Sequence, residues 1–212
     1  MFSAAPLRSQ MIRSLLVPAL SLVVFFLACA PVRVSAAVVV LDPGHGGHDP
    51  GGIPGQRVVE KRAALDVALR VKARLKAAGH RVIMTRSTDE FVELSQRVAI
   101  SNGTPSSAVF VSIHFNSAPN SDAHGIETYH FSGRSTRLAE AIHQRVVAAT
   151  GEEDRGVRKA RFYVLRYNRR TAVLAELGFL TNAREGGRVA RSPGYCQKLA
   201  DAVAGGVLAV VR

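Results

Sequence analysis

The chain has 212 residues, of which 47% are hydrophobic and 21% charged, and its formal net charge is +12. These values are typical of one globular domain with a sizeable core, and they exclude a disordered or low-complexity protein. The basicity favours a polyanionic partner such as an anionic cell-wall polymer or a membrane surface, although a well-solvated surface accounts for it equally well.

The first 37 residues have the organisation of a secretory signal peptide. Arg8 and Arg13 precede an apolar run over residues 15–30, and small residues follow at positions 35–37. A basic start, an apolar stretch and a small-residue exit are typical of a cleaved signal. A retained membrane anchor is the alternative, but the run contains a proline and is shorter than the roughly 20 apolar residues of a spanning helix. We therefore expect export, with cleavage near residue 37.

Cys29 is a candidate site for attachment of a lipid anchor. Residues 26–29 resemble a bacterial lipobox, whose cysteine becomes lipidated, although Phe26 stands where such sites usually carry a smaller aliphatic residue. Lipid anchoring is thus the less favoured interpretation. After removal of residues 1–37 the chain keeps only Cys196, so it cannot form an internal disulfide. We expect residues 38–212 to form a periplasmic, extracellular or wall-associated monomer with no transmembrane span.

Strand-like and helix-like segments alternate over the rest of the chain. This alternation predicts a single α/β domain, with a mostly parallel twisted β-sheet and helices on both faces. Apolar and β-branched runs predict the strands, and apolar residues at helical spacing predict the helices. The predicted strands cover residues 38–41, 81–85, 108–113, 125–131, 162–165 and 172–177, and the predicted helices cover 64–78, 93–102, 136–149 and 197–211.

Four chemically reactive side chains stand at the ends of these elements. His45 follows the first predicted strand, His114 ends the third, and Glu176 ends a late one. Because the carboxyl ends of parallel strands meet at one edge of a sheet, these side chains should lie in one crevice. Glu60 would join them from the start of the first helix, where a carboxylate also suits the helix dipole.

Two imidazoles and a carboxylate can hold a zinc ion and leave its fourth position open for water. A second carboxylate nearby can move the proton of that water, so the set suits hydrolysis of an amide. Each residue also has a simpler interpretation. The histidines could be polar loop residues, Glu60 could serve only the helix start, and Glu176 could form a salt bridge.

The motifs around these residues resemble those of the zinc-dependent N-acetylmuramoyl-L-alanine amidases of bacterial cell-wall turnover. The resemblance covers nearly all of residues 38–212, and the order and spacing of its elements make it specific. They are LDPGHGGHDPG at 41–51, EK at 60–61, TRSTD at 85–89, VSIHFN at 111–116, GIE at 125–127, DRGV at 154–157 and AELGFLTN at 175–182.

The resemblance implies one zinc ion, held by His45, Glu60 and His114, with Glu176 as the catalytic carboxylate. It also implies cleavage of the amide between N-acetylmuramic acid and the L-alanine of the peptidoglycan stem peptide, in wall turnover or daughter-cell separation. Peptidoglycan is then the expected partner, and export argues against nucleic acid.

Several other residues are weaker candidates. Asn116 and Arg155 are predicted substrate contacts. Asn116 lies two positions after a metal-ligand candidate, so its amide could instead orient the groups that surround the metal ligands. Arg97 could brace a carboxylate of the site or be a charge on a helix surface. His143 is predicted to be solvated. Seven cations and three aromatic residues between positions 155 and 170 could bind stem-peptide carboxylates or anionic glycan, or form a solvated edge.

Three alternative functions remain open from the sequence. A secreted basic nucleic-acid binder would show steeply salt-dependent affinity for DNA and would not need zinc. A zinc peptidase or deacetylase acting on wall fragments would use the same metal but cut a different bond, and product analysis separates it from an amidase. An exported basic wall-binding protein without catalysis would lack a metal ligand or the catalytic glutamate, whereas all four residues are present here.

Overall fold

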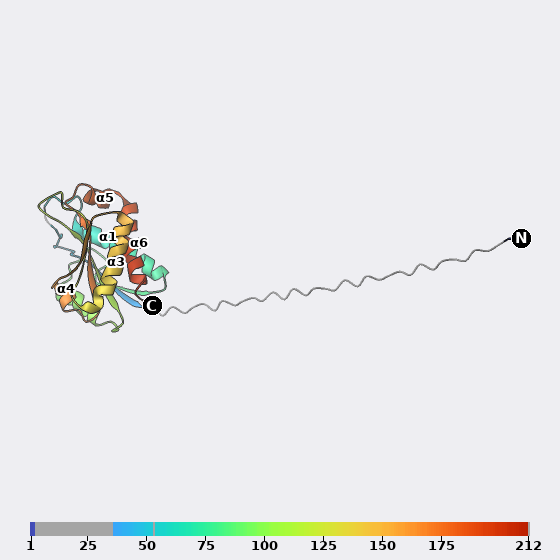
Figure 1. Cartoon of the computed structure of the whole chain (residues 1–212). Helices are drawn as coiled ribbons and strands as arrows, with labels where there is room; N and C mark the ends of the chain where they lie inside the picture. The colour runs from blue at the N-terminus through green and yellow to red at the C-terminus, as the bar shows by residue number, and fades with distance from the viewer. Residues whose placement is uncertain (3–35, 53, 212) are drawn as a thin grey trace. The chain divides into compact units, whose positions relative to one another are not determined.

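The computed structural model describes residues 1–2, 36–52 and 54–211 (Figure 1). Nearly all of the predicted signal peptide, including the lipobox candidate Cys29, lies outside the described residues. Within them, no helix is long and apolar enough to cross a membrane.

A six-stranded sheet forms the centre of the domain, with strand order β2-β1-β3-β6-β4-β5. The first four strands in this order are parallel, β4 runs antiparallel to β6, and β5 runs parallel to β4. The mostly parallel sheet predicted from the sequence is therefore confirmed. The strands are β1 (Val38–Pro43), β2 (Arg81–Met84), β3 (Val109–Asn116), β4 (Ile126–His130), β5 (Asp154–Lys159) and β6 (Thr171–Phe179).

Helices cover both faces of the sheet, as the sequence predicts (Figure 1). On one face the long helices α1, α3 and α6 bury the larger apolar cluster, and on the other α2 and α4 bury a smaller one. The helices are α1 (Glu60–Ala77), α2 (Leu94–Asn102), α3 (Thr136–Thr150), α4 (Tyr163–Arg166), α5 (Glu185–Arg191) and α6 (Pro193–Leu208), with a 3₁₀ turn η1 (Gly133–Ser135) before α3.

Residues of the central strands alternate between the two clusters. Val111 of β3 packs in the larger cluster, whereas its neighbour Phe110 packs in the smaller one. Strands that are buried on both faces read as nearly continuous apolar runs, which is why β1, β3 and β6 are recognisable in the sequence. The same alternation turns Asp42, His114 and Glu176 toward the face covered by α2 and α4.

Four elements differ from the prediction. Residues 163–165, predicted with Phe162 as a strand, lie in α4 instead, because a short apolar run does not distinguish a strand from a helical turn. The edge strand β5 and the short helix α5 were not predicted, because β5 is polar and α5 contains two glycines. Helix α6 begins at Pro193, earlier than predicted, where the Ser192 side chain accepts a hydrogen bond from the Tyr195 backbone N–H.

Candidate metal centre

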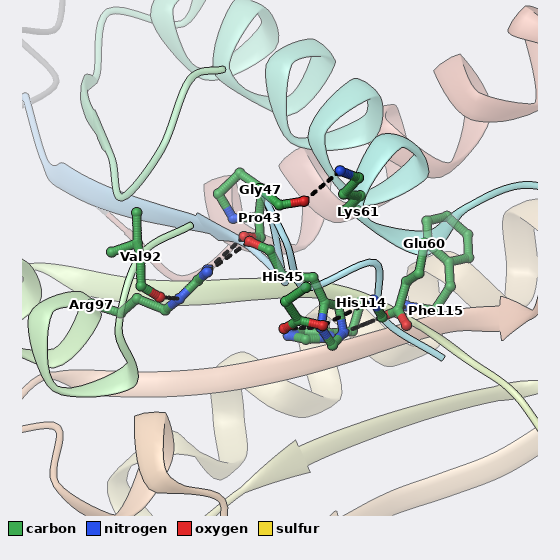
Figure 2. A network of polar contacts seen from close by, with 12 residues as sticks. Pro43, His45, Gly47, Glu60, Lys61, Val92, Arg97, His114 and Phe115 are labelled. Atoms are coloured by element: carbon green, nitrogen blue, oxygen red, sulfur yellow. Dashed lines mark hydrogen bonds and ion pairs between the residues drawn. The ribbon is translucent and has the colours of Figure 1, made fainter. Parts of the chain in front are cut away.

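Three side chains from distant parts of the chain converge beyond the carboxyl ends of β1 and β3 (Figure 2). His45 lies in the loop after β1, Glu60 is the first residue of α1, and His114 lies near the end of β3. Glu60 Oε1 lies 3.1 Å from His45 Nε2 and 3.0 Å from His114 Nδ1. The convergence predicted from the sequence is therefore present.

The conformation of the loop after β1 allows His45 and His114 to lie close together. The backbone of His45 is left-handed, with φ at 60°, a conformation that costs a residue with a Cβ atom free energy and must be stabilised by its surroundings. Gly44 is required for a different reason, because a Cβ atom there would stand 2.2 Å from Cε1 of His114. A larger residue at position 44 would therefore displace a metal-ligand candidate.

Hydrogen bonds fix how the donor atoms face one another. Nδ1 of His45 donates to Asp49 Oδ2 at 2.8 Å, so Nε2, which faces Glu60, is the ring nitrogen placed to bind a metal ion. The Phe115 backbone N–H donates to Glu60 Oε1 at 3.1 Å. Burial raises the pKa of Glu60, but the hydrogen bonds and charges of His114 and His45 outweigh this effect and lower it to about 2. Glu60 is therefore ionised under all ordinary conditions.

The donor set fits a zinc ion. The donor atoms of the three residues lie within 4.8 Å of one another, and no other such group of three occurs in the part of the chain that the structure describes. A tetrahedral site with ligand distances of about 2.0 Å has edges of about 3.3 Å, close to the two separations above. Two neutral imidazoles and one carboxylate would also leave a net charge of about +1 on a divalent ion.

Glu176 lies beside this group in the same pocket, which has a volume of 610 Å³. It is the register partner of His114 across the β3–β6 ladder. Its Oε2 is buried and has no hydrogen-bond partner among the described residues, so the predicted alternative of a salt bridge is not observed. Burial, followed by the charges of Glu60 and Glu127, raises the pKa of Glu176 well above its usual range. Such a carboxyl group can hold a proton near neutral pH.

Arg97 is a buried residue that holds the loop of His45. Its side chain is 3% exposed and pairs with Asp42 at 2.8 Å, and it donates to the backbone carbonyls of Pro43 and His45 at 2.7 Å each (Figure 2). The surface position considered for Arg97 from the sequence is therefore wrong. Arg86 donates to the carbonyls of Pro43 and Gly44 from the other side. Two arginines thus bind three consecutive carbonyls of this loop.

Glu127 is a buried carboxylate that sequence reasoning did not assign a role. It is the register partner of Glu176 in the β4–β6 ladder. It accepts hydrogen bonds from Arg155 Nε at 2.8 Å, Asn116 Nδ2 at 3.0 Å and the Tyr129 hydroxyl at 2.7 Å. Burial raises its pKa, but the hydrogen bonds from Arg155 and Tyr129 outweigh this effect and lower it.

The two predicted substrate contacts, Asn116 and Arg155, therefore share one partner within the protein. Asn116 also lines the pocket, whereas Arg155 is not among the lining residues. Glu127 lies in the GIE motif, Asn116 in VSIHFN and Arg155 in DRGV, so the sequence marked each residue but not the contacts between them.

His143 is buried, so its predicted solvation is wrong. Its ring contacts Thr128 Oγ1 at 3.2 Å and Asp154 Oδ1 at 2.7 Å, and the residue is 3% exposed. It lies on the face of α3 that packs against β4 and β5, one position after Ile142 of the apolar core. The histidine therefore joins α3 to the sheet and takes no part in the metal centre.

The chain is similar to known proteins over most of its length. The chain is 37% identical to the N-acetylmuramoyl-L-alanine amidase LytC of Bacillus subtilis, over 84% of this chain and 36% of LytC. It is 39% identical to the uncharacterised protein YqiI of the same organism, over 92% of this chain and 95% of YqiI. It thus spans about a third of the length of LytC and nearly all of YqiI.

Among solved structures, the chain resembles the catalytic domain of CwlV, an N-acetylmuramoyl-L-alanine amidase from Bacillus (Paenibacillus) polymyxa. The TM-score is 0.76 at 37% identity, covering 83% of this chain and 99% of that domain. The family described as N-acetylmuramoyl-L-alanine amidase matches residues 39–209. The fold, the motifs and these matches establish that the chain belongs to the N-acetylmuramoyl-L-alanine amidase family.

Proposed function

We propose that the protein is a zinc-dependent hydrolase that cleaves the amide between N-acetylmuramic acid and L-alanine in peptidoglycan, in wall turnover or daughter-cell separation. One observation carries the proposal: three metal-ligand candidates surround a single point, and the buried, unpartnered carboxyl of Glu176 shares their pocket. Family membership gives the bond and the substrate.

We assign His45, Glu60 and His114 as the residues that hold one zinc ion. When bound, the ion supplies Lewis acidity, which lowers the pKa of water and polarises the scissile carbonyl. Asp49 fixes the tautomer of His45, and the low pKa of Glu60 keeps its carboxylate free of a competing proton.

Glu176 is assigned the proton transfers. As a carboxylate it takes a proton from the attacking water, and as a carboxylic acid it delivers that proton to the nitrogen of the departing L-alanine, which regenerates the carboxylate. Its raised pKa favours this exchange, because a carboxyl group that titrates closer to neutral pH can both accept and release a proton there.

Asn116 and Arg155 are kept as proposed substrate contacts. Asn116 lines the pocket, and one N–H of its amide remains available after the bond to Glu127. For Arg155, Nη2 makes no hydrogen bond within the described residues. Both side chains are oriented by Glu127, which faces Glu176 across the ladder.

We also propose that residues 1–37 are a signal peptide and residues 38–212 the catalytic domain, so that the mature protein acts in the periplasm or at the wall. The basic and apolar segments of the first 30 residues support export, as does a substrate that lies outside the cytoplasm.

Mass spectrometry of digested peptidoglycan tests the function. The protein purified after export should release stem peptides with a free L-alanine amine, and neither Glu176→Ala nor chelator-treated protein should do so. Release of shorter peptides or of acetate would instead indicate a peptidase or a deacetylase. Intact wall after incubation with fully zinc-loaded protein would contradict a self-sufficient amidase.

A further inference from the structure

The chain from β5 to the start of β6 carries an unbalanced positive charge. No acidic residue occurs between Asp154 and Glu176, yet this stretch contains seven cations: Arg155, Arg158, Lys159, Arg161, Arg166, Arg169 and Arg170. Three of them have partners within the protein. Arg155 and Arg158 approach Glu127, and Arg170 donates to two backbone carbonyls near the end of α2.

The other four cations are exposed, and none has a carboxylate partner in the described part of the chain; they are Lys159, Arg161, Arg166 and Arg169. We call these four residues the cationic surface. Two of its charges rest over aromatic rings, Lys159 Nζ at 5.7 Å from the centre of Phe131 and Arg166 Cζ at 5.1 Å from that of Tyr167. A ring leaves a cation accessible to an anion, because it occupies none of its hydrogen-bond donors.

Exposed aromatic side chains connect the cationic surface to the pocket. Phe162, Tyr163 and Tyr167 are 41–49% exposed, which is unusual for three aromatic residues so close together. Phe162 and Tyr163 line the pocket that also contains Glu176. Of the four cations, Arg161 directly precedes Phe162 in the chain and Arg166 lies three residues after Tyr163 in α4, so these two cations adjoin the aromatic residues that line the pocket.

Helix α4 packs against α2 and β6, on the sheet face opposite to α1, α3 and α6 (Figure 1). A long polymer that enters the pocket from this side would pass over both the aromatic residues and the cations.

We propose that the cationic surface docks peptidoglycan by binding the free carboxylates of its stem peptides while one muramoyl amide occupies the pocket. The proposal rests on the proposed function, which supplies an anionic polymer as substrate. A single exposed ion pair contributes little free energy, but several weak contacts along one polymer act together. Such binding weakens steeply with salt, because exposed charges are screened.

A binding experiment with two matched variants tests this proposal. The protein, zinc-loaded and carrying Glu176→Ala so that it does not degrade the wall, is sedimented with purified peptidoglycan stripped of phosphate polymers. The surface variant replaces the four cations of the cationic surface by glutamine. The control variant makes the same change in charge at four exposed cations without ion-pair partners among the described residues, which lie in or beside α1, β2, α3 and α6: Lys76→Gln, Arg81→Gln, Arg145→Gln and Lys198→Gln.

We expect the surface variant to bind roughly tenfold more weakly at low ionic strength, and the control variant to stay within about twofold of the parent. The difference should disappear at about 0.5 M salt. Peptidoglycan whose carboxylates have been amidated should bind the parent as weakly as unmodified peptidoglycan binds the surface variant.

Three results would overturn the proposal. Equal losses in both variants would attribute binding to net charge alone. A loss seen only with wall that retains its phosphate polymers, or only with vesicles of anionic lipid, would assign the surface to phosphate groups. No loss in either variant would leave the surface without a role in docking. The active parent is assayed separately on a small soluble muropeptide, so that a failure of the proposed function is recognised independently of the binding result.

Discussion

Arg97 Nη2 donates a hydrogen bond of 2.7 Å to the backbone carbonyl of His45, although the two residues are 52 positions apart in the chain. The same guanidinium binds Asp42 in a buried ion pair, and Asp42 also accepts hydrogen bonds from Thr85 and Ser112. The left-handed loop that carries a metal-ligand candidate is therefore held by a charge network beneath it. Arg97 is a positioning residue, since it acts on the metal centre through the backbone of His45.

Replacement of Arg97 by lysine should weaken zinc binding by about tenfold, because lysine keeps the charge but cannot reach several carbonyls at once. Zinc affinity is measured by competition with a chromogenic chelator. Arg170→Lys is the matched control, because Arg170 also donates to two backbone carbonyls, those of Asn102 and Thr104, and none of these three residues lines the pocket. Both variants should lose stability, but a loss of zinc affinity in both would contradict a positioning role for Arg97.

Replacement of Asp49 by alanine should lower zinc affinity by about 10–100-fold, because the partner that orients His45 Nδ1 is lost. Asp66→Ala serves as the control, since Asp66 pairs with Arg70 on the surface of α1. The absorption spectrum of the cobalt-substituted protein gives a second readout, and it should change for the first variant only. An unchanged spectrum together with unchanged affinity would show that the ring of His45 is oriented without Asp49.

Gly44→Ala should prevent metal binding, because its Cβ atom would stand 2.2 Å from the ring of His114 and the ring or the loop would have to move. Gly133→Ala is the control, since a Cβ atom there meets no atom within 4 Å. Calorimetric titration with zinc compares the two variants. A Gly44→Ala protein that binds zinc as tightly as the parent would mean that the β1 loop adapts to the extra methyl group.

The sequence was sufficient to predict the convergence of His45, His114 and Glu176, because each follows or ends a strand of a parallel sheet. It was not sufficient to predict the contacts beneath them. Arg97 looks like any charged residue of a short helix, and only the tertiary arrangement shows its side chain buried against the β1 loop. Glu127 is hidden for a similar reason, since its partners come from three separate segments.

The prediction of secondary structure failed where the pattern of apolar residues did not distinguish one element from another. A buried helical turn such as α4 and a buried strand share the same short apolar run. The edge strand β5 faces solvent and carries cations. Charged side chains prevent an edge strand from pairing with another chain, but they also remove the apolar pattern by which a strand is recognised in the sequence.

Glu176→Gln should reduce the rate of amide hydrolysis by about 10²–10⁴-fold, because glutamine cannot transfer a proton.

The same substitution should also change how the stability of the zinc-free protein depends on pH. Burial raises the pKa of Glu176 above its ordinary value of 4.5, so the folded state favours the protonated carboxyl. The contribution of Glu176 to the free energy of unfolding is therefore fully present below pH 4.5, and it is lost as the pH rises through the folded-state pKa. Thermal unfolding of chelator-treated protein in a series of buffers between about pH 4 and 8 measures this pH dependence of stability. The melting temperature of the parent should fall relative to that of Glu176→Gln as the pH rises, and parallel curves would contradict a raised pKa.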